Sequence, residues 1–167
     1  FTGGFTPPLS ISGVPAFEGR LSGNLISGGW FTTFGTQVIA GRELTDRDVK
    51  GAPRVAVINQ AFASKFFPGA SPLGHTISLY PGGARAMPPM EIVGVVGDAV
   101  YSSLRAQVPP TWYAPLSQFD LPEFTQVSFQ FQLAVRSQTN SPVASNDVAA
   151  AIGRVNPKLA LTFRPLS

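Results

Sequence analysis

The sequence of 167 residues lacks cysteine, and it has one histidine and only 13% charged residues. Without cysteine, neither a disulfide framework nor a thiolate metal site can form. The single histidine, His75, cannot by itself build a metal cluster or a catalytic triad. The 12 Lys and Arg are scattered singly against 9 Asp and Glu, so no basic stripe marks a nucleic-acid partner.

Long apolar runs are also missing. No segment approaches the roughly 20 apolar residues that cross a bilayer, and no signal-peptide pattern opens the chain. The sequence starts at Phe1 instead of Met and ends on "FRPLS". We interpret it as a piece of a longer protein, whose targeting or membrane segments would lie outside it.

Motifs for nucleotide binding and hydrolysis are absent as well: the sequence contains no G-x-G-x-x-G, no G-x-x-x-x-G-K and no G-x-S-x-G. The acidic group of Glu43, Asp46 and Asp48 lacks the spacing of a calcium loop, and nearby arginines favour a solvated loop with local ion pairs. We predict no catalytic, cofactor-binding or metal-binding residue. An enzyme centred on His75 or Asp98 is the alternative, although Asp98 has the default role of a turn residue.

What the sequence does contain is apolar surface and turns. Hydrophobic residues make up 44%, with 13 Phe, and the 17 Gly and 16 Pro follow no repeat. This composition favours a β-rich α+β protein with many short elements.

The first third predicts a weak strand at Leu9–Ile11 and a strand that ends near Ser27. Trp30, Phe31 and Phe34 then follow helical spacing, and Gly35 is placed to end that turn. The segment "TQVIAGREL" is expected to form the next strand.

The stretch "RVAVINQAFASKFFPG" reads as a buried strand, a turn at Asn59 and a helix. Strand-to-helix turns hold phosphates or nucleophiles in many enzymes, so Asn59 could open a site. We predict instead that Asn59 caps the helix, because Phe62, Ala63, Phe66 and Phe67 form an apolar stripe behind it.

The second half predicts strands at "HTISLY" and "MEIVGVVGDA", joined by a long hairpin loop, with the latter strand central. Residues 127–136 alternate apolar and polar side chains, which is the clearest strand pattern of the chain. Ser141 and Pro142 are placed to start a helix with an apolar stripe from Val148 to Val155, and "LALTFR" is expected to be a final strand.

Two aromatic residues among prolines, Trp112 and Tyr113 in "PPTWY", could form a patch that stacks on a ligand or peptide. The alternative is that they pack an edge strand onto its lobe. A free-standing binding module that uses this patch is our second functional hypothesis.

The order of motifs from 27 to 116 resembles the MacB-like periplasmic core domain of FtsX-like ABC-transporter permeases, in particular orphan permeases of soil bacteria such as acidobacteria. The phrases are "ISGGWFTTFGTQVIAGRELTDRD", "VAVINQAFASKFFPGASPLGHTI", "MEIVGVVGDAVYSSLR" and "TWYAPL". Two departures are Trp30, where Tyr is usual, and His75, where Lys or Arg is usual. The matching positions are Trp30, Phe31, Gly35, Gly41, Arg42, Asp48, 57–59, Phe67, Pro72, Gly74 and 92–98.

This resemblance implies two lobes: a porter-like βαβ lobe from 1–71 and 117–167, and an inserted β-rich lobe from 72–116. It implies a non-catalytic periplasmic domain of an inner-membrane protein that passes motion across the membrane or docks partners. The implied partners are transmembrane helices of its own permease, a cytoplasmic ATPase acting indirectly, and a periplasmic adaptor or lipoprotein. It assigns structural roles to Asn59, Gly35, Arg42, Gly74 and Asp98, and implies that the family's first strand and helix lie upstream of Phe1.

Overall fold

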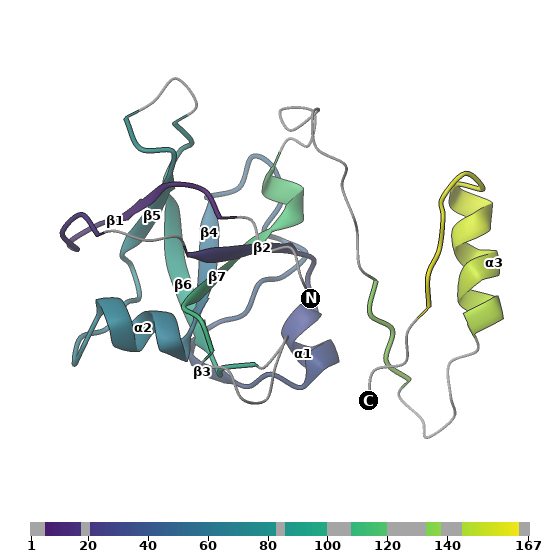
Figure 1. The fold of residues 1–167 in the computed structure, drawn as a ribbon, viewed down its shortest axis with the longest axis horizontal. Coiled ribbons are helices and arrows are strands. Elements are labelled where there is room, and N and C mark those ends of the chain that lie inside the picture. Colours follow the sequence, from purple (N-terminus) through teal and green to yellow (C-terminus); the bar gives the residue numbers. More distant parts are fainter. Residues whose placement is uncertain are drawn as a thin grey trace. The chain divides into compact units, whose positions relative to one another are not determined.

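A mixed seven-stranded sheet organises most of the chain in the computed structural model (Figure 1). The structure describes residues 6–17, 21–82, 86–99, 108–119, 133–137 and 145–163. They fall into two compact units, 1–128 (unit 1) and 129–167 (unit 2). The expected α+β class is confirmed.

Unit 1 holds all the strands that the structure describes. They are β1 (Leu9–Ile11), β2 (Ser22–Ile26), β3 (Val38–Gly41), β4 (Val55–Asn59), β5 (Thr76–Leu79), β6 (Met90–Val96) and β7 (Thr111–Pro115). Its helices are α1 (Trp30–Phe34), α2 (Gln60–Phe66) and the short 3-10 helix η1 (Leu116–Gln118). The expected strands, the turn at Trp30 and the helix after Asn59 are therefore confirmed in this unit.

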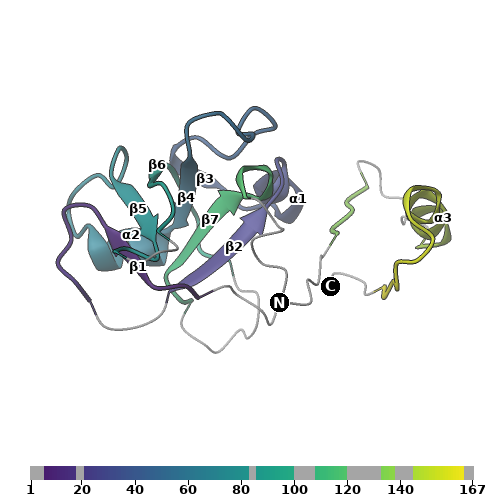
Figure 2. The same cartoon turned by 90° about the horizontal axis from the view of Figure 1, so that it is seen from above.

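The sheet runs in the order β1-β5-β6-β4-β7-β2, and β6 is its centre. Along one side β6 pairs in parallel with β4, and along the other it pairs with β5 near its start and with β3 near its end. Figure 2 shows β7 and β2 side by side beyond β4, where they run parallel from Ser22 opposite Thr111 to Ile26 opposite Pro115. A strand with neighbours on both sides and apolar residues on both faces must be central, as the sequence predicted for β6.

Two glycines let β3 and β6 approach closely. Gly41 lies opposite Gly94 in the antiparallel pairing. A Cβ at Gly94 would lie 2.0 Å from the carbonyl oxygen of Arg42, and a Cβ at Gly41 would lie 2.2 Å from the carbonyl oxygen of Val93. Gly41 also has a φ of 68°, which side chains disfavour. No other residue fits this crossing without moving backbone.

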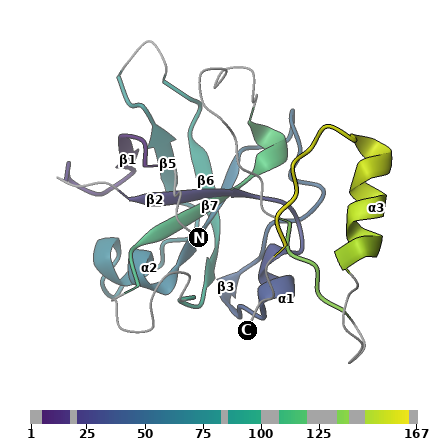
Figure 3. The same ribbon diagram turned by 45° about the vertical axis from the view of Figure 1, so that its right-hand side comes forward.

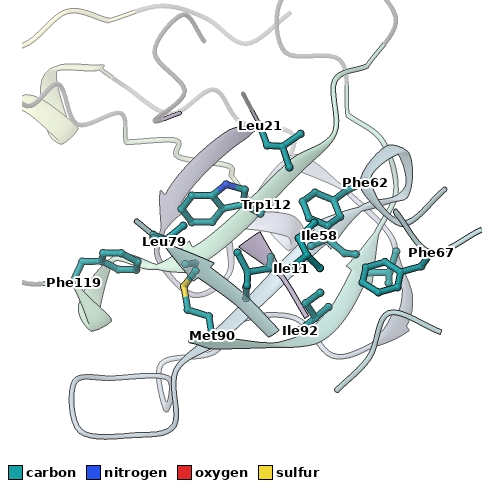
Figure 4. Close-up of a cluster of buried hydrophobic side chains, with 14 residues drawn as sticks. Ile11, Leu21, Ile58, Phe62, Phe67, Leu79, Met90, Ile92, Trp112 and Phe119 are labelled. Carbon is teal, nitrogen blue, oxygen red and sulfur yellow. The ribbon is translucent and has the colours of Figure 1, made fainter. Parts of the chain in front are cut away.

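The two faces of the sheet carry separate apolar clusters. The larger cluster includes Ala56 and Ile58 of β4, Trp112 of β7 and Phe62 of α2 (Figure 4). The smaller one includes Val55 and Val57 of β4, Tyr113 of β7 and Phe31 of α1. Successive strand residues point to opposite faces, so the two clusters lie on opposite sides of the sheet. Because α2 contributes Phe62 to the larger cluster and α1 contributes Phe31 to the smaller one, the two helices cover opposite sides (Figures 2 and 3).

Unit 2 contains the helix α3 (Ser145–Val155), which confirms the expected helix, while its predicted cap at Ser141 lies outside the described residues. Two expectations are corrected here. The described parts of the two predicted strands, 133–136 and 159–163, are not assigned as strands. A strand needs a pairing neighbour, and the described part of unit 2 supplies none to either segment.

The expected lobe boundaries stay a prediction. Residues 72–116 are expected to form an inserted lobe, and in the structure their strands β5, β6 and β7 pair with β1, β3, β4 and β2 in one sheet. The division between compact units lies near 128.

Candidate functional site

Asn59 ends β4 at the edge where α/β enzymes commonly place their sites, the carboxyl end of parallel strands. Its Oδ1 accepts hydrogen bonds from the backbone N–H groups of Phe62 (3.0 Å) and Thr111 (2.9 Å). Its Nδ2 donates to the carbonyl oxygen of Pro109 at 3.0 Å. The predicted cap is confirmed, and the same amide also ties the start of β7 to α2.

Asp98, just beyond β6, serves the same turn. Its Oδ1 accepts a hydrogen bond of 2.9 Å from the backbone N–H of Ala61. Two first-turn N–H groups of α2 are thus bound by side chains of the chain itself, one from Asn59 and one from Asp98. This edge of the sheet is a joint between β4, β6 and β7, and no anion is needed to complete it.

A hollow of about 580 Å³ lies beside this joint. Asp98 and Lys65 are the charged residues that line it, and Val108 and Pro109 are among its apolar walls. Asp98 already accepts a backbone hydrogen bond, and the sole histidine is not part of the lining. The polar side chains of its lining are Ser64, Lys65 and Asp98.

The second polar cluster is the loop after β3. Arg42 donates two hydrogen bonds of 2.8 Å to the two carboxylate oxygens of Asp48, which is 5% exposed. The backbone N–H of Thr45 also donates to Asp48 at 2.8 Å. Glu43 and Asp46 take no part in this pair; the Oε1 of Glu43 is 3.5 Å from the hydroxyl of Thr32. The expected local ion pair is present, and it folds the loop over the smaller cluster beside the buried Leu44.

The charge state of this pair follows from its geometry. The hydrogen bonds from Arg42 lower the pKa of Asp48 despite its burial, which acts in the opposite direction, and the N–H of Thr45 lowers it further. The hydrogen bond to Asp48 raises the pKa of Arg42. Both groups are held in their charged forms, as a structural ion pair requires.

Gln118 is a buried polar residue that no sequence pattern predicts. It is 6% exposed, its Oε1 accepts a hydrogen bond from the N–H of Val55, and its Nε2 donates to the carbonyl oxygen of Pro53. Ser117 donates to the carbonyl oxygen of Asp48 at 2.8 Å. The local pattern "PLSQF" does not predict this role, because the residues that Gln118 hydrogen-bonds lie more than 60 positions earlier in the sequence.

Trp112 and Tyr113 are not the exposed patch that the sequence suggested. They are 0% and 1% exposed, and they belong to opposite faces of the sheet. Gly23 of β2 lies under the indole of Trp112, where a Cβ would approach the ring to 2.1 Å. The phenol ring of Tyr113 meets Phe31 edge to face at 5.1 Å. The alternative interpretation, that these aromatic residues pack a strand onto its lobe, agrees with this burial, but β7 lies between β4 and β2 and is not an edge strand.

His75 lies at the start of β5. Its Nδ1 is 3.0 Å from the carbonyl oxygen of Ser12, and its ring is 4.8 Å from that of Phe67. The hydroxyl of Ser12 accepts a hydrogen bond from the N–H of Thr76. These contacts hold the chain after β1 against β5, and no carboxylate is among the partners of His75 that the described residues show.

The two remaining structural positions are glycines at turns. Gly35 has a φ of 67° and ends α1, with its N–H donating to the carbonyl oxygen of Thr32. Gly74 has a φ of 83°, and its N–H donates to the carbonyl oxygen of Ile92. Both positions favour glycine because its missing Cβ removes the penalty of a positive φ.

Across the described ranges, no group of three or more His, Asp or Glu side chains is placed to hold a metal ion. In those same ranges, no helix is long and apolar enough to cross a membrane.

The chain is similar to a known family and to solved structures. A family profile described as MacB-like periplasmic core domain matches residues 6–155. The periplasmic region of MacB from Actinobacillus actinomycetemcomitans is similar with a TM-score of 0.62 and 20% identity, over 92% of this chain and 64% of that one. A domain of a putative permease from Porphyromonas gingivalis is similar with a TM-score of 0.56 and 15% identity, over 92% and 65%. A search of curated proteins found no match.

Proposed function

Because the chain belongs to the MacB-like periplasmic core domain family, we propose that it serves as the periplasmic domain of an ABC-transporter permease, where it passes conformational change across the membrane without catalysing a reaction. The observation that carries this proposal is the family match over residues 6–155. The chain spans about 64% of the matched MacB region, so the activity of the whole permease is part of the proposal.

The polar chemistry of unit 1 supports a mechanical role. Asn59, Asp48 and Gln118 are all at least nine-tenths buried. Asn59 and Gln118 hydrogen-bond backbone groups more than 50 positions away in the sequence, and Asp48 hydrogen-bonds a backbone group of its own loop. Buried polar groups that are fully occupied in this way make a body rigid and specific in shape. A rigid body is what a relay of motion needs, whereas an active site needs groups left available for substrate.

The partners follow from the same proposal. The domain would connect to transmembrane helices of its own polypeptide and, through them, to a cytoplasmic ATPase, and a periplasmic adaptor or lipoprotein would dock on its outer surface. Ligand stacking on Trp112 and Tyr113 finds no support in their burial, and a ligand would reach them only by opening the core.

The test uses the parent permease, assembled with its ATPase in proteoliposomes. Replacing residues 6–163 by a short flexible linker should leave basal ATP hydrolysis in place and abolish the change in hydrolysis rate that a periplasmic partner or cargo produces. An exposed substitution in β1, Ser10→Ala, is the matched control and should behave as the wild type. A linker variant that couples normally would contradict the relay, and turnover of an ester, phosphate or peptide by the purified domain would contradict the non-catalytic assignment.

A further inference from the structure

The segment between β3 and β4, residues 42–54, contacts both the chain that follows β2 and the chain that follows β7, and we call it the strap. β2 and β7 run parallel, so their ends at Ile26 and Pro115 lie opposite each other (Figure 2). β2 continues through a turn into α1, and β7 continues directly into η1. The strap therefore joins two parts of unit 1 that are far apart in the sequence.

Hydrogen bonds join the strap to η1 in both directions. The hydroxyl of Ser117 donates to the carbonyl oxygen of Asp48 at 2.8 Å. The Nε2 of Gln118 donates to the carbonyl oxygen of Pro53 at 2.9 Å. In return, the Nη2 of Arg54 donates to the carbonyl oxygen of Gln118 at 2.7 Å. Because each side supplies both donors and acceptors, η1 cannot separate from the strap without leaving polar groups of both without these partners.

Close packing joins the strap to the α1 side. Gly28, in the turn before α1, lies so near Asp46 that a Cβ at this glycine would be 2.5 Å from the Oδ1 of the carboxylate. Leu44 of the strap is 2% exposed and belongs to the smaller cluster together with Phe31 of α1. The strap is thus packed against one continuation and hydrogen-bonded to the other.

The strap is ordered internally around a single carboxylate. Asp48, which is 5% exposed, accepts two hydrogen bonds from Arg42 and one from the backbone N–H of Thr45. A buried carboxylate that loses one partner keeps the cost of its burial, so its hydrogen bonds tend to break together. The carbonyl oxygen of the same residue accepts the hydrogen bond from Ser117. One residue therefore links the internal order of the strap to the attachment of η1.

The strap and η1 differ from the sheet in how well they are protected. All residues of β4 and β7 are buried, whereas the strap exposes Thr45, Arg47 and 45% of Val49. Segments with few buried apolar contacts open at lower free energy than a packed sheet, and they open in contiguous cooperative units. The mutual hydrogen bonds place the strap and η1 in the same unit.

We infer that the strap and residues 116–119 form one latch, which opens cooperatively before the sheet unfolds. Its opening releases the end of β7, from which the chain continues to unit 2. The guanidinium of Arg54, 4.8 Å from the centre of the Phe119 ring, extends the closed latch to the last of these residues. The inference goes beyond the transport role proposed above and does not depend on it, because it concerns which segments of unit 1 open together.

Native-state hydrogen exchange of the 167-residue chain, followed by NMR at low concentrations of denaturant, tests the latch. Three hydrogen-bonded backbone N–H groups are compared: Thr45 in the strap, Phe119 after η1 and Ile92 in β6. We expect Thr45 and Phe119 to share one opening free energy and one dependence on denaturant. Ile92 should be protected at least about tenfold more strongly, because it exchanges when the sheet unfolds.

Two substitutions loosen the latch from opposite sides. Ser117→Ala removes a hydrogen bond of η1, and Arg42→Gln removes the guanidinium that donates within the strap. Each should speed exchange at Thr45 and at Phe119 by the same factor. We expect about threefold to tenfold for Ser117→Ala and at least about tenfold for Arg42→Gln, whose hydrogen bonds are charge-assisted. The matched control, Ser10→Ala at an exposed position of β1, should leave both rates unchanged.

The remaining outcomes overturn the inference. A substitution that speeds exchange on its own side alone, in the strap or after η1, would show that the two segments open separately. Equal protection of Thr45, Phe119 and Ile92 would show that the strap opens when the whole of unit 1 unfolds. Faster exchange in the control variant by the same factor would show that the effect is not specific to the latch.

Discussion

Units 1 and 2 both have clear apolar patterns, but they differ in how far the apolar residues are buried. In unit 1 every residue of β4 and β7 is buried, and helices cover both faces of the sheet. In unit 2 the helix α3 has no buried residue, and the apolar positions beside it are exposed. The difference shows that periodicity specifies which face of an element is apolar, whereas burial depends on a partner that the pattern does not name.

The largest loss of stability is expected for a substitution at the centre of unit 1. Trp112→Ala should lower the free energy of unfolding by about 3 to 5 kcal/mol, because it empties a fully buried position above Gly23. Its matched control is Val155→Ala in unit 2, which should change stability by less than about 0.5 kcal/mol because that side chain is 86% exposed. Urea denaturation followed by circular dichroism measures both, and equal losses would mean that the two units are alike.

Close packing of backbone in unit 1 gives a second test. Gly94→Ala should cost about 1 to 3 kcal/mol or more, because the new Cβ would lie 2.0 Å from the carbonyl oxygen of Arg42 and would push β3 from β6. Gly97→Ala, three residues after Gly94, meets only an ordinary contact of 3.7 Å and should be near neutral. A pair of variants with the same denaturation midpoint would show that β3 and β6 can separate without cost.

The hydrogen bonds of Asn59 should contribute more to the stability of the fold than a helix cap alone does. Asn59→Ala removes the acceptor of two backbone N–H groups, and we expect a loss of about 2 to 3 kcal/mol, because the N–H of Thr111 is left without its partner in the core. Asp98→Ala removes one exposed acceptor from the same turn and should cost about 0.5 to 1 kcal/mol. Thermal unfolding of the two variants measures the difference, and a neutral Asn59→Ala would reopen the case for a binding site at this edge.

The last prediction concerns the loop that closes the smaller cluster, where the effect depends on pH. Asp48→Asn should cost about 1 to 3 kcal/mol at pH 7 through the lost charge-assisted hydrogen bonds. Because folding lowers the pKa of Asp48, its contribution is complete above its unfolded pKa of about 3.9 and is lost as the pH falls through the lower folded value. The gap in stability between wild type and variant should therefore be constant from pH 7 to about 5 and close at more acidic pH. A gap that does not depend on pH would show that the ion pair does not stabilise the fold.

Local chemistry was sufficient to predict several features from the sequence. Asn59 followed by an apolar stripe predicts a capped helix because the acceptor and the N–H groups lie within three residues of each other. Gly35 predicts a helix end for the same reason of proximity, and β6 reads as central because both its faces are apolar. The arginine beside the acidic loop likewise predicts a local ion pair, although it does not identify Asp48 as the partner.

Long-range pairing was decided only by the tertiary structure. Asn59 bonds to Thr111 and Gln118 bonds to Val55 across more than 50 positions, and no local pattern marks such partners. The prolines before Trp112 and Tyr113 are typical of loops and left a surface patch and a packed strand both open, whereas β4 and β2 flank their strand and bury both rings. The sequence by itself determined which faces are apolar and where helices begin, because those depend on neighbours along the chain. Only the fold decided which faces are buried, because burial depends on strands brought together from distant positions.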